Sequence, residues 1–209
     1  HYHDSFGVTL HEMHRYDEAL AEKQKALELE PDNAQYHYSL GVTLHEMERY
    51  DKALAEKQKA VDLEPDNVEY YYSLGVTLHE MNRYDEALAE KRKAVDIEPD
   101  NAKYHDSLGV TLYAIRRYNE ALAETQKAVE LEPDNSKYHD SLGTALHAMK
   151  RYNEALAEKH EAVKLEPGNA KYHDSLGTTL HAMKRYDAAL EEKHEAVKLE
   201  PGNAKYHDS

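Results

Sequence analysis

The sequence predicts an all-α fold built as a solenoid, that is, a stack of short helical repeats. All six prolines are spaced 34 residues apart, and six of the eight glycines keep the same spacing. The prolines are Pro31, Pro65, Pro99, Pro133, Pro167 and Pro201, and the periodic glycines are Gly7, Gly41, Gly75, Gly109, Gly143 and Gly177. A fixed period of this length is typical of proteins that stack one small structural unit along an axis.

The repeats align without gaps. We expect one array over residues 1–209, with repeats at 1–33, 34–67, 68–101, 102–135, 136–169 and 170–203 and a partial repeat at 204–209. The chain does not begin with Met and stops six residues into a new repeat, so we expect it to be a fragment of a longer array.

Each repeat is expected to hold two helices, and the second repeat shows why. Asn33 follows Pro31 and can cap a helix that begins at Ala34. At about 100° per residue, one arc of this helix is its predicted buried face, formed by Tyr36, Leu40, Thr43, Leu44 and Met47. The apolar pattern then stops, and Asp51 is the predicted cap of a second helix that Pro65 ends. Its predicted inward residues are Ala53, Leu54, Ala60, Val61 and Leu63.

Composition favours many small interfaces over one deep core, because hydrophobic residues make up 40% of the chain and it has one Phe and no Trp. The net charge of −15 argues against a nucleic-acid partner, since such binding depends on Lys and Arg displacing counterions. The apolar runs are too short to span a membrane, and no signal pattern is present. We therefore expect no membrane partner and a cytoplasmic location. The lack of cysteine excludes disulfides and thiolate metal sites.

The acidic charge is concentrated in the first half. Residues 1–101 carry 23 acidic and 11 basic residues, whereas residues 102–209 carry 18 and 15. On the second helices, Glu and Lys three residues apart can form exposed pairs on a solvated face. The predicted pairs are Glu22/Lys25, Glu56/Lys59, Glu90/Lys93, Glu124/Lys127, Glu161/Lys164 and Glu195/Lys198.

The repeat resembles the tetratricopeptide repeat, whose signature over 34 residues is W-x2-L-G-x2-Y, then A-x3-F, then P. The second repeat reads His37-x2-Leu40-Gly41-x2-Leu44, then Ala53-x3-Lys57, then Pro65. Positions are counted from the first residue of each repeat, with Ala34 as position 1 and His1 as position 2 of the first repeat. The family has aromatic residues at positions 4 and 24. Here position 4 holds His, or Tyr71 in the third repeat, and position 24 holds Lys, or Thr125 in the fourth. We expect the invariant tyrosines at positions 3 and 17, such as Tyr36 and Tyr50, to fill the gap between the helices. The glycine at position 8 should let the two helices approach closely.

The resemblance implies a right-handed superhelix whose first helices line a groove that binds a peptide or protein segment. The family's groove positions are 2, 5, 9, 12 and 13. The matching residues that we take as the candidate site are Gln35, Tyr38, Val42, His45, Glu46, Glu69, Tyr72, Val76, His79, Glu80, Lys103, Asp106, Tyr113, Lys137, His147, Lys171 and His181. The carboxylate clamp of one subfamily is not expected, because only its position-2 lysines are matched here.

No catalytic motif is predicted. His-Asp-Ser recurs, for example at His105 to Ser107, but consecutive helical residues point about 100° apart and cannot form a triad. His11-Glu12 lacks the second His that a zinc-protease helix needs, because Arg15 stands there. Each glycine lies inside a helix or after a proline, so no phosphate loop is present. We expect a protein that is not an enzyme and has no cofactor.

Position 12 holds a row of histidines: His11, His45, His79, His147 and His181. Imidazole suits zinc or nickel, but packed helices lie about 8 to 10 Å apart, which is wide for two side chains to share one ion. We expect a polar row that contacts the partner, and no metal site. The fifteen histidines, if charged, would offset the charge of −15, so a second hypothesis is loss of solubility or self-association below about pH 6.

Two other functions remain open. The last full helix shows Leu190 and Val197 with six residues left to cover them, so copies of the chain could stack end to end. The array could also be the regulatory tetratricopeptide region of a larger enzyme.

Overall fold

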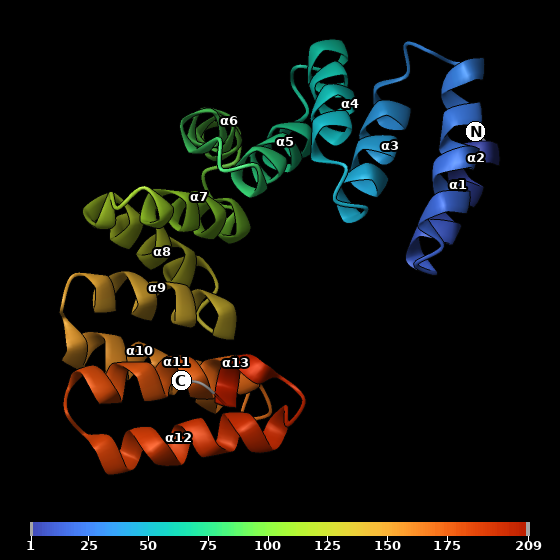
Figure 1. Ribbon diagram of the computed structural model, residues 1–209. Coiled ribbons are helices and arrows are strands. Elements are labelled where there is room, and N and C mark those ends of the chain that lie inside the picture. The colour runs from blue at the N-terminus through green and yellow to red at the C-terminus, as the bar shows by residue number, and fades with distance from the viewer. Residues whose placement is uncertain (1, 208–209) are drawn as a thin grey trace. The chain divides into compact units, whose positions relative to one another are not determined.

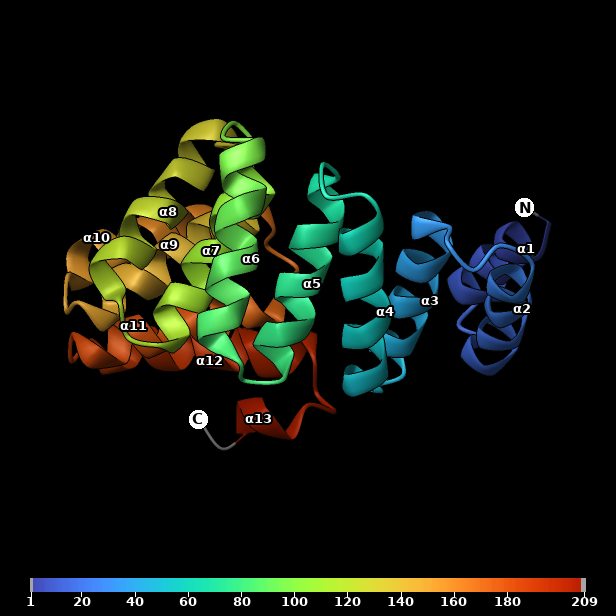
Figure 2. The same cartoon turned by 90° about the horizontal axis from the view of Figure 1, so that it is seen from above.

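The computed structural model describes residues 2–207, and every element in that range is a helix (Figures 1 and 2). The chain forms two compact units, His1–Pro99 and Asp100–Ser209. The first unit contains α1 (Tyr2–Glu12), α2 (Tyr16–Leu29), α3 (Ala34–Glu46), α4 (Tyr50–Leu63), α5 (Val68–Glu80) and α6 (Tyr84–Ile97). The second contains α7 (Ala102–Ala114), α8 (Tyr118–Leu131), α9 (Ser136–Ala148), α10 (Tyr152–Leu165), α11 (Ala170–Ala182), α12 (Tyr186–Leu199) and the short α13 (Ala204–His207). The all-α solenoid class is confirmed, whereas the organisation as one array stays a prediction.

The first helix of a repeat begins after a capping asparagine, as predicted. The Asn33 side chain accepts a hydrogen bond from the Tyr36 backbone N–H at 3.2 Å, and Asn67 accepts one from Glu69 at the same distance. These bonds satisfy backbone donors that have no partner inside the helix. Asn135 and Asn169 cap α9 and α11 in the same way.

The turn between the two helices differs from the prediction. The second helix begins at Tyr50, after Arg49 and without a side-chain cap, so the assignment of Asp51 as its cap is wrong. Glu48 in the turn has a positive φ of 57°, and the Arg49 N–H bonds to the Leu44 carbonyl at 2.9 Å. This left-handed residue satisfies the last carbonyls of the first helix. His14, Asn82, Arg116, Lys150 and Lys184 adopt the same conformation in the other repeats.

Close contact at glycine holds the two helices of each repeat together. A Cβ atom added at Gly41 would lie 2.7 Å from Lys57 Cγ and 3.3 Å from the Ala53 carbonyl oxygen. Only a residue without a side chain fits there, which confirms the predicted role of this glycine. The side chain that fills the space is Lys57, however, and not a tyrosine.

The apolar core consists of small clusters between neighbouring repeats. Leu40, Leu44 and Ala53 pack against Leu20 and Leu27 of the preceding repeat. In the second unit, Leu142, Leu146 and Ala155 pack against Leu122 and Val129. Each repeat therefore buries its apolar face against its neighbour, as expected of a solenoid.

The predicted buried face of α3 is confirmed, with Met47 half-buried at its end. On α4, Leu63 is 41% exposed, so its inward placement is wrong. The position-3 tyrosines are buried from Tyr36 onward, but Tyr2 is exposed. The position-17 tyrosines are half-buried, except Tyr186, which is exposed.

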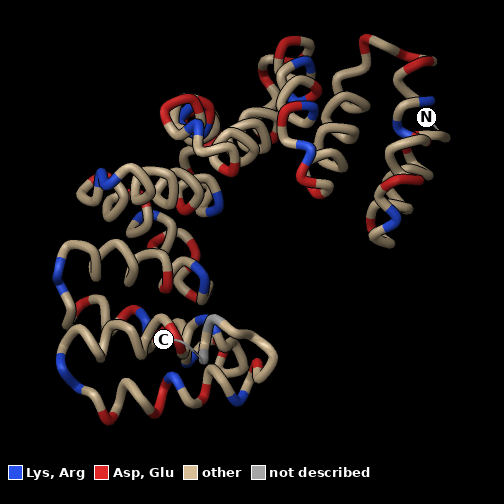
Figure 3. The backbone as a smooth tube through the Cα atoms, viewed as in Figure 1, with Lys and Arg blue, Asp and Glu red and all other residues tan. Residues whose placement is uncertain are grey.

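Charged residues occur in every repeat (Figure 3). Five of the predicted pairs form, among them Lys25–Glu22 at 2.7 Å and Lys164–Glu161 at 2.8 Å. The other three are Lys59–Glu56, Lys93–Glu90 and Lys198–Glu195. None of the helices within residues 2–207 is both long and apolar enough to cross a membrane.

Candidate binding surface

The first helices of neighbouring repeats lie side by side within each unit. In the first unit α3 contacts α1 and α5, and in the second unit α9 contacts α7 and α11. We call the side of these helices that carries positions 2, 5, 9, 12 and 13 the first-helix face. All of the predicted site residues belong to it by position, and the structure shows how far each is accessible.

In the first unit the face is partly open and aromatic. Tyr38, Val42, Glu69, Tyr72, Val76, His45 and His79 are half-buried, while Gln35, Glu46 and Glu80 are exposed. The ring of Tyr38 lies 5.0 Å from that of Tyr70, and its hydroxyl donates to Glu69 at 3.4 Å. Burial, followed by the nearby Glu69 carboxylate, raises the pKa of Tyr38 to about 12, so its hydroxyl remains a hydrogen-bond donor at neutral pH.

The row of histidines is tied to the next repeat. His45 Nδ1 lies 3.0 Å from Thr77 Oγ1, and its ring packs edge-on against Tyr50 at 5.2 Å. His147 lies 3.1 Å from Thr179 Oγ1 in the second unit. Burial, followed by the charge of Lys57, lowers the pKa of His45, so the ring is neutral at pH 7. One nitrogen of the His11, His45 and His147 rings is thus occupied inside the protein, which leaves the other edge for a partner.

Beneath these histidines lie buried lysines that the sequence analysis missed. Lys57 is 2% exposed, and its Nζ donates to Thr77 Oγ1 at 2.8 Å and to the Ser73 carbonyl at 3.2 Å. Lys23 makes the equivalent bonds to Thr43 and Ser39. Burial lowers the pKa of Lys57 to about 7 and that of Lys23 to about 8, since the charged form loses its hydration.

We call the set at positions 24 and 12 of one repeat and position 10 of the next the junction cluster. At the α4/α5 junction it consists of Lys57, His45 and Thr77, and at the α2/α3 junction of Lys23, His11 and Thr43. One signal in the sequence could have revealed the lysine. Lys57 follows Ala53 by four residues and precedes Ala60 by three, so it lies on the same buried stripe of α4.

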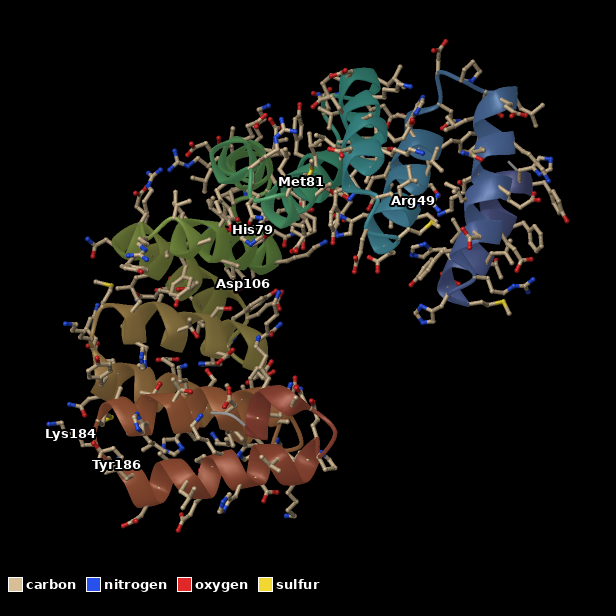
Figure 4. The ribbon with its side chains drawn as sticks, viewed as in Figure 1. Arg49, His79, Met81, Asp106, Lys184 and Tyr186 are labelled. Carbon is tan, nitrogen blue, oxygen red and sulfur yellow. The ribbon has the colours of Figure 1, made fainter. Side chains whose placement is uncertain are left out.

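The second unit places part of the predicted site inside the protein. Asp106, which is labelled in Figure 4, was expected on the open face. It is fully buried, and this placement is corrected. Its carboxylate pairs with Lys137 Nζ of the next repeat at 2.9 Å. Asp140, one repeat later, pairs with Lys171 at 3.5 Å. Lys137 and Lys171 are themselves exposed, as are Tyr113 and His181, while Lys103 and His147 are half-buried.

A cavity of about 480 Å³ opens on the first-helix face of the second unit. Its walls come from α7, α9 and α11, and Thr125 of α8 and Lys159 of α10 also line it. The remaining lining residues combine apolar with polar groups: Gly109, Val110, Tyr113, Asp140, Ser141, Thr144, Ala145, His147, Lys171, Asp174, Ser175 and Thr178. A hollow of this size can hold a side chain of a bound peptide or a small ligand.

Among the residues that the structure describes, no three His, Cys, Asp or Glu side chains come together as metal ligands would. The row of histidines is spaced by whole repeats, and its hydrogen bonds go to threonine hydroxyls. The histidine nitrogens of this row are therefore not arranged as the ligands of one metal ion within the described residues.

Comparisons with known proteins point to one family. Models described as TPR repeat match residues 7–48 and 43–82, and models described as tetratricopeptide repeat match residues 68–101 and 102–135. Together these matches span more than half of the chain. No curated protein sequence matches it.

Solved structures share the fold. YrrB, described as a TPR protein with an unusual peptide-binding site, is 24% identical, with a TM-score of 0.66 over 89% of this chain and 96% of its own. PilF of Pseudomonas aeruginosa is 20% identical, with a TM-score of 0.82 over 99% and 94%. A chain of the APC/C hetero-tetramer Cut9–Hcn1 is 16% identical, with a TM-score of 0.84. The match covers 99% of this chain and 41% of that chain.

Proposed function

Because this chain belongs to the tetratricopeptide repeat family, whose members serve generally as protein-interaction scaffolds, we propose that it binds a peptide or protein segment on its first-helix face. The observation that carries the proposal is the half-buried row of tyrosines and histidines on α3 and α5. Rings that are partly packed and partly accessible offer contact area at little entropic cost, as binding surfaces do. The similarity to YrrB, itself described as having a peptide-binding site, agrees with this function.

The charge of the face suggests the kind of segment that binds to the first unit. Glu46 and Glu80 are exposed at the ends of α3 and α5, and residues 1–101 carry about twice as many acidic as basic residues. A segment with basic and aromatic residues would complement this surface. We propose that the protein catalyses no reaction and binds neither nucleic acid nor metal.

Selection from a displayed peptide library tests the proposal. We expect peptides selected on the wild-type chain to lose at least about tenfold in affinity to the double variant Glu46→Lys with Glu80→Lys, because opposite charges become like charges. Both residues are exposed, so the fold should persist. The matched control is Glu28→Lys with Asp62→Lys on the second helices, which changes the net charge by the same amount at exposed positions. Peptides that lose affinity for the control variant but keep their affinity for the Glu46→Lys with Glu80→Lys variant would contradict the proposal.

A second candidate function is self-association. Tyr186 and Leu190 on α12 are 57% and 55% exposed, and exposed apolar groups that lie one turn apart can join two copies. Val197, also expected to be uncovered, is half-buried in the cluster that contains Tyr206 of α13. Sedimentation velocity over a hundredfold range of concentration should show association that Leu190→Gln removes, and a monomer throughout would exclude it.

A further inference from the structure

The α8/α9 junction lacks the junction cluster whose residues are present at the α2/α3, α4/α5 and α10/α11 junctions. Position 24 is Thr125 where α4 has Lys57, and position 10 of the next repeat is Ala145 where α5 has Thr77. Position 12 is Tyr113 in place of a histidine. All three replacing residues line the cavity of the second unit. Part of the cavity therefore occupies the place in which the chain elsewhere inserts its own lysine, while Lys159 and Lys171 line the part toward α11 together with Asp140 and Asp174.

Thr125 is too short to take over the role of that lysine. Its hydroxyl donates to the Ala121 carbonyl of its own helix at 2.9 Å. At Gly109 an added Cβ would meet Thr125 Cγ2 at 2.7 Å, so the threonine covers the glycine as the first carbons of lysine do elsewhere. The rest of the space, where lysine would extend to its ammonium group, belongs to the cavity.

Part of the polar surroundings of an ammonium group is kept, although Ala145 cannot replace the threonine acceptor. At the α10/α11 junction, Lys159 Nζ donates to Ser175 Oγ at 2.5 Å, and Ser175 donates to Asp140 at 2.6 Å. The equivalent residues at α8/α9 are Ser141, which lines the cavity, and Asp106, one helical turn before Gly109 and Val110. The acidic half of the arrangement is thus kept where the lysine is missing.

Asp106 is short of positive charge in comparison with Asp140. Asp140 has Lys171 beside it and is linked to the buried Lys159 through Ser175. Within the described residues Asp106 forms an ion pair with Lys137 alone, and the Lys137 side chain is 60% exposed. Lys137 Nζ lies 2.9 Å from Asp106 Oδ2, but neither Asp106 oxygen has a hydrogen bond within the described residues. A buried carboxylate is costly without hydrogen-bonded compensation.

We propose that the cavity at the α8/α9 junction is a lysine-binding pocket, in which the ammonium group of a partner's lysine side chain takes the place of the missing position-24 lysine. The methylene groups of the ligand would lie along Val110, Tyr113 and Ala145, and its ammonium group would reach toward Ser141 and the charge of Asp106. This inference rests on the proposed function and names the residue type that the second unit recognises.

An NMR titration of the whole chain with n-butylammonium tests the pocket without any partner protein. This probe has the length and charge of a lysine side chain, and n-butanol is its neutral counterpart. We expect the methyl signals of Val110 to shift and saturate with n-butylammonium, with at least a tenfold weaker response to n-butanol, since hydrogen bonds to charged groups are the stronger ones. Equal responses to the two probes, or none, would overturn the proposal.

Two variants sharpen the test. Thr125→Lys with Ala145→Thr restores a pair that this chain already uses at α4/α5, so it should fold while filling the pocket and abolishing the response. Asp106→Asn should weaken binding about tenfold, whereas Asp134→Asn in the exposed linker should change nothing. A wild-type response in the refilled variant would refute the pocket. Such a failure would leave peptide binding on the first unit untouched, because that is measured by charge reversal on α3 and α5.

Discussion

The α4/α5 and α8/α9 junctions fill the same place in the repeat with different chemistry. At α4/α5 a lysine, a histidine and a threonine close the space, whereas at α8/α9 the smaller Thr125 and Ala145 leave a cavity. The helix pairs beside the two junctions are held alike. An added Cβ at Gly41 or at Gly109 would lie 3.3 Å from the carbonyl oxygen of Ala53 or Ala121, respectively. Junction residues can therefore change without altering the close approach of the helices.

This comparison separates two tasks of the repeat. Glycine and alanine at positions 8 and 20 set the distance between the helices, and the residues at positions 10, 12 and 24 decide whether the junction is filled from within or open to a ligand. An array of near-identical repeats can thus vary its recognition one junction at a time, because each repeat contacts only its neighbours.

The largest expected effect comes from truncating position 24 at the two junctions. Lys57→Ala should lower the unfolding free energy by about 3 kcal/mol. The lysine is only 2% exposed, and the substitution removes most of its long side chain and leaves a cavity. Thr125→Ala should cost about 1 kcal/mol, since it removes one methyl group and a local hydrogen bond beside an existing cavity.

Urea unfolding followed by circular dichroism measures both variants. It should be done at pH 9, where the Lys57 amine is neutral and packing dominates. The exposed Lys52→Ala serves as control and should change the unfolding free energy by less than about 0.5 kcal/mol. Equal losses at positions 57 and 125 would mean that the two junctions are packed alike, contrary to the comparison.

The next effect is a rise in stability with pH. The pKa of Lys57 is about 7 and that of Lys23 about 8 in the folded chain, against an ordinary value of 10.5. Between these values the unfolded chain binds more protons, so stability increases as pH rises and is lost as pH falls toward 7. We expect a gain of at least about 2 kcal/mol between pH 7 and 9.5, because the lowered pKa of Lys57 alone accounts for that much.

Lys57→Met should reduce this slope, because it keeps the apolar volume and removes the titrating amine. Measurements should stop below pH 10, since the raised pKa of Tyr38 and Tyr70, about 12 each, makes stability fall where unfolded tyrosines ionise. Thr125→Ala should leave the slope unchanged. A flat profile in the wild-type chain would show that the buried lysines are charged in both states at pH 9.

The sequence was sufficient to predict the repeat, the asparagine caps and the buried face of the first helices, because these follow from spacing and from local backbone chemistry. It was misleading at Lys57, because tyrosines were expected to fill the gap between the helices, whereas the spacing of Lys57 from Ala53 and Ala60 places the lysine there. Asp106 was assigned to the open face because it stands at groove position 5 of the family, yet it is fully buried.

The cavity could not have been predicted from any single repeat. It depends on the space that three residues leave empty, and these residues lie on three different helices: Tyr113 on α7, Thr125 on α8 and Ala145 on α9. The structure shows that Lys57, Thr77 and His45 contact one another. With this known, the alignment of the repeats shows that all three of their counterparts are replaced at the α8/α9 junction.

The smallest effect concerns the turn that both kinds of repeat share. Glu48 and Arg116 have φ values of 57° and 63°, a conformation that costs an ordinary residue about 1 kcal/mol and glycine almost nothing. Glu48→Gly and Arg116→Gly should each stabilise the fold by somewhat less than about 1 kcal/mol, because glycine also gains freedom in the unfolded chain. Asn82→Gly should gain less, since asparagine tolerates this conformation better. Thermal unfolding measures all three. Equal gains in stability at Glu48 and Arg116 would show that the difference between the junctions does not affect the turn. A gain in stability in one of the two repeats alone would show that it does.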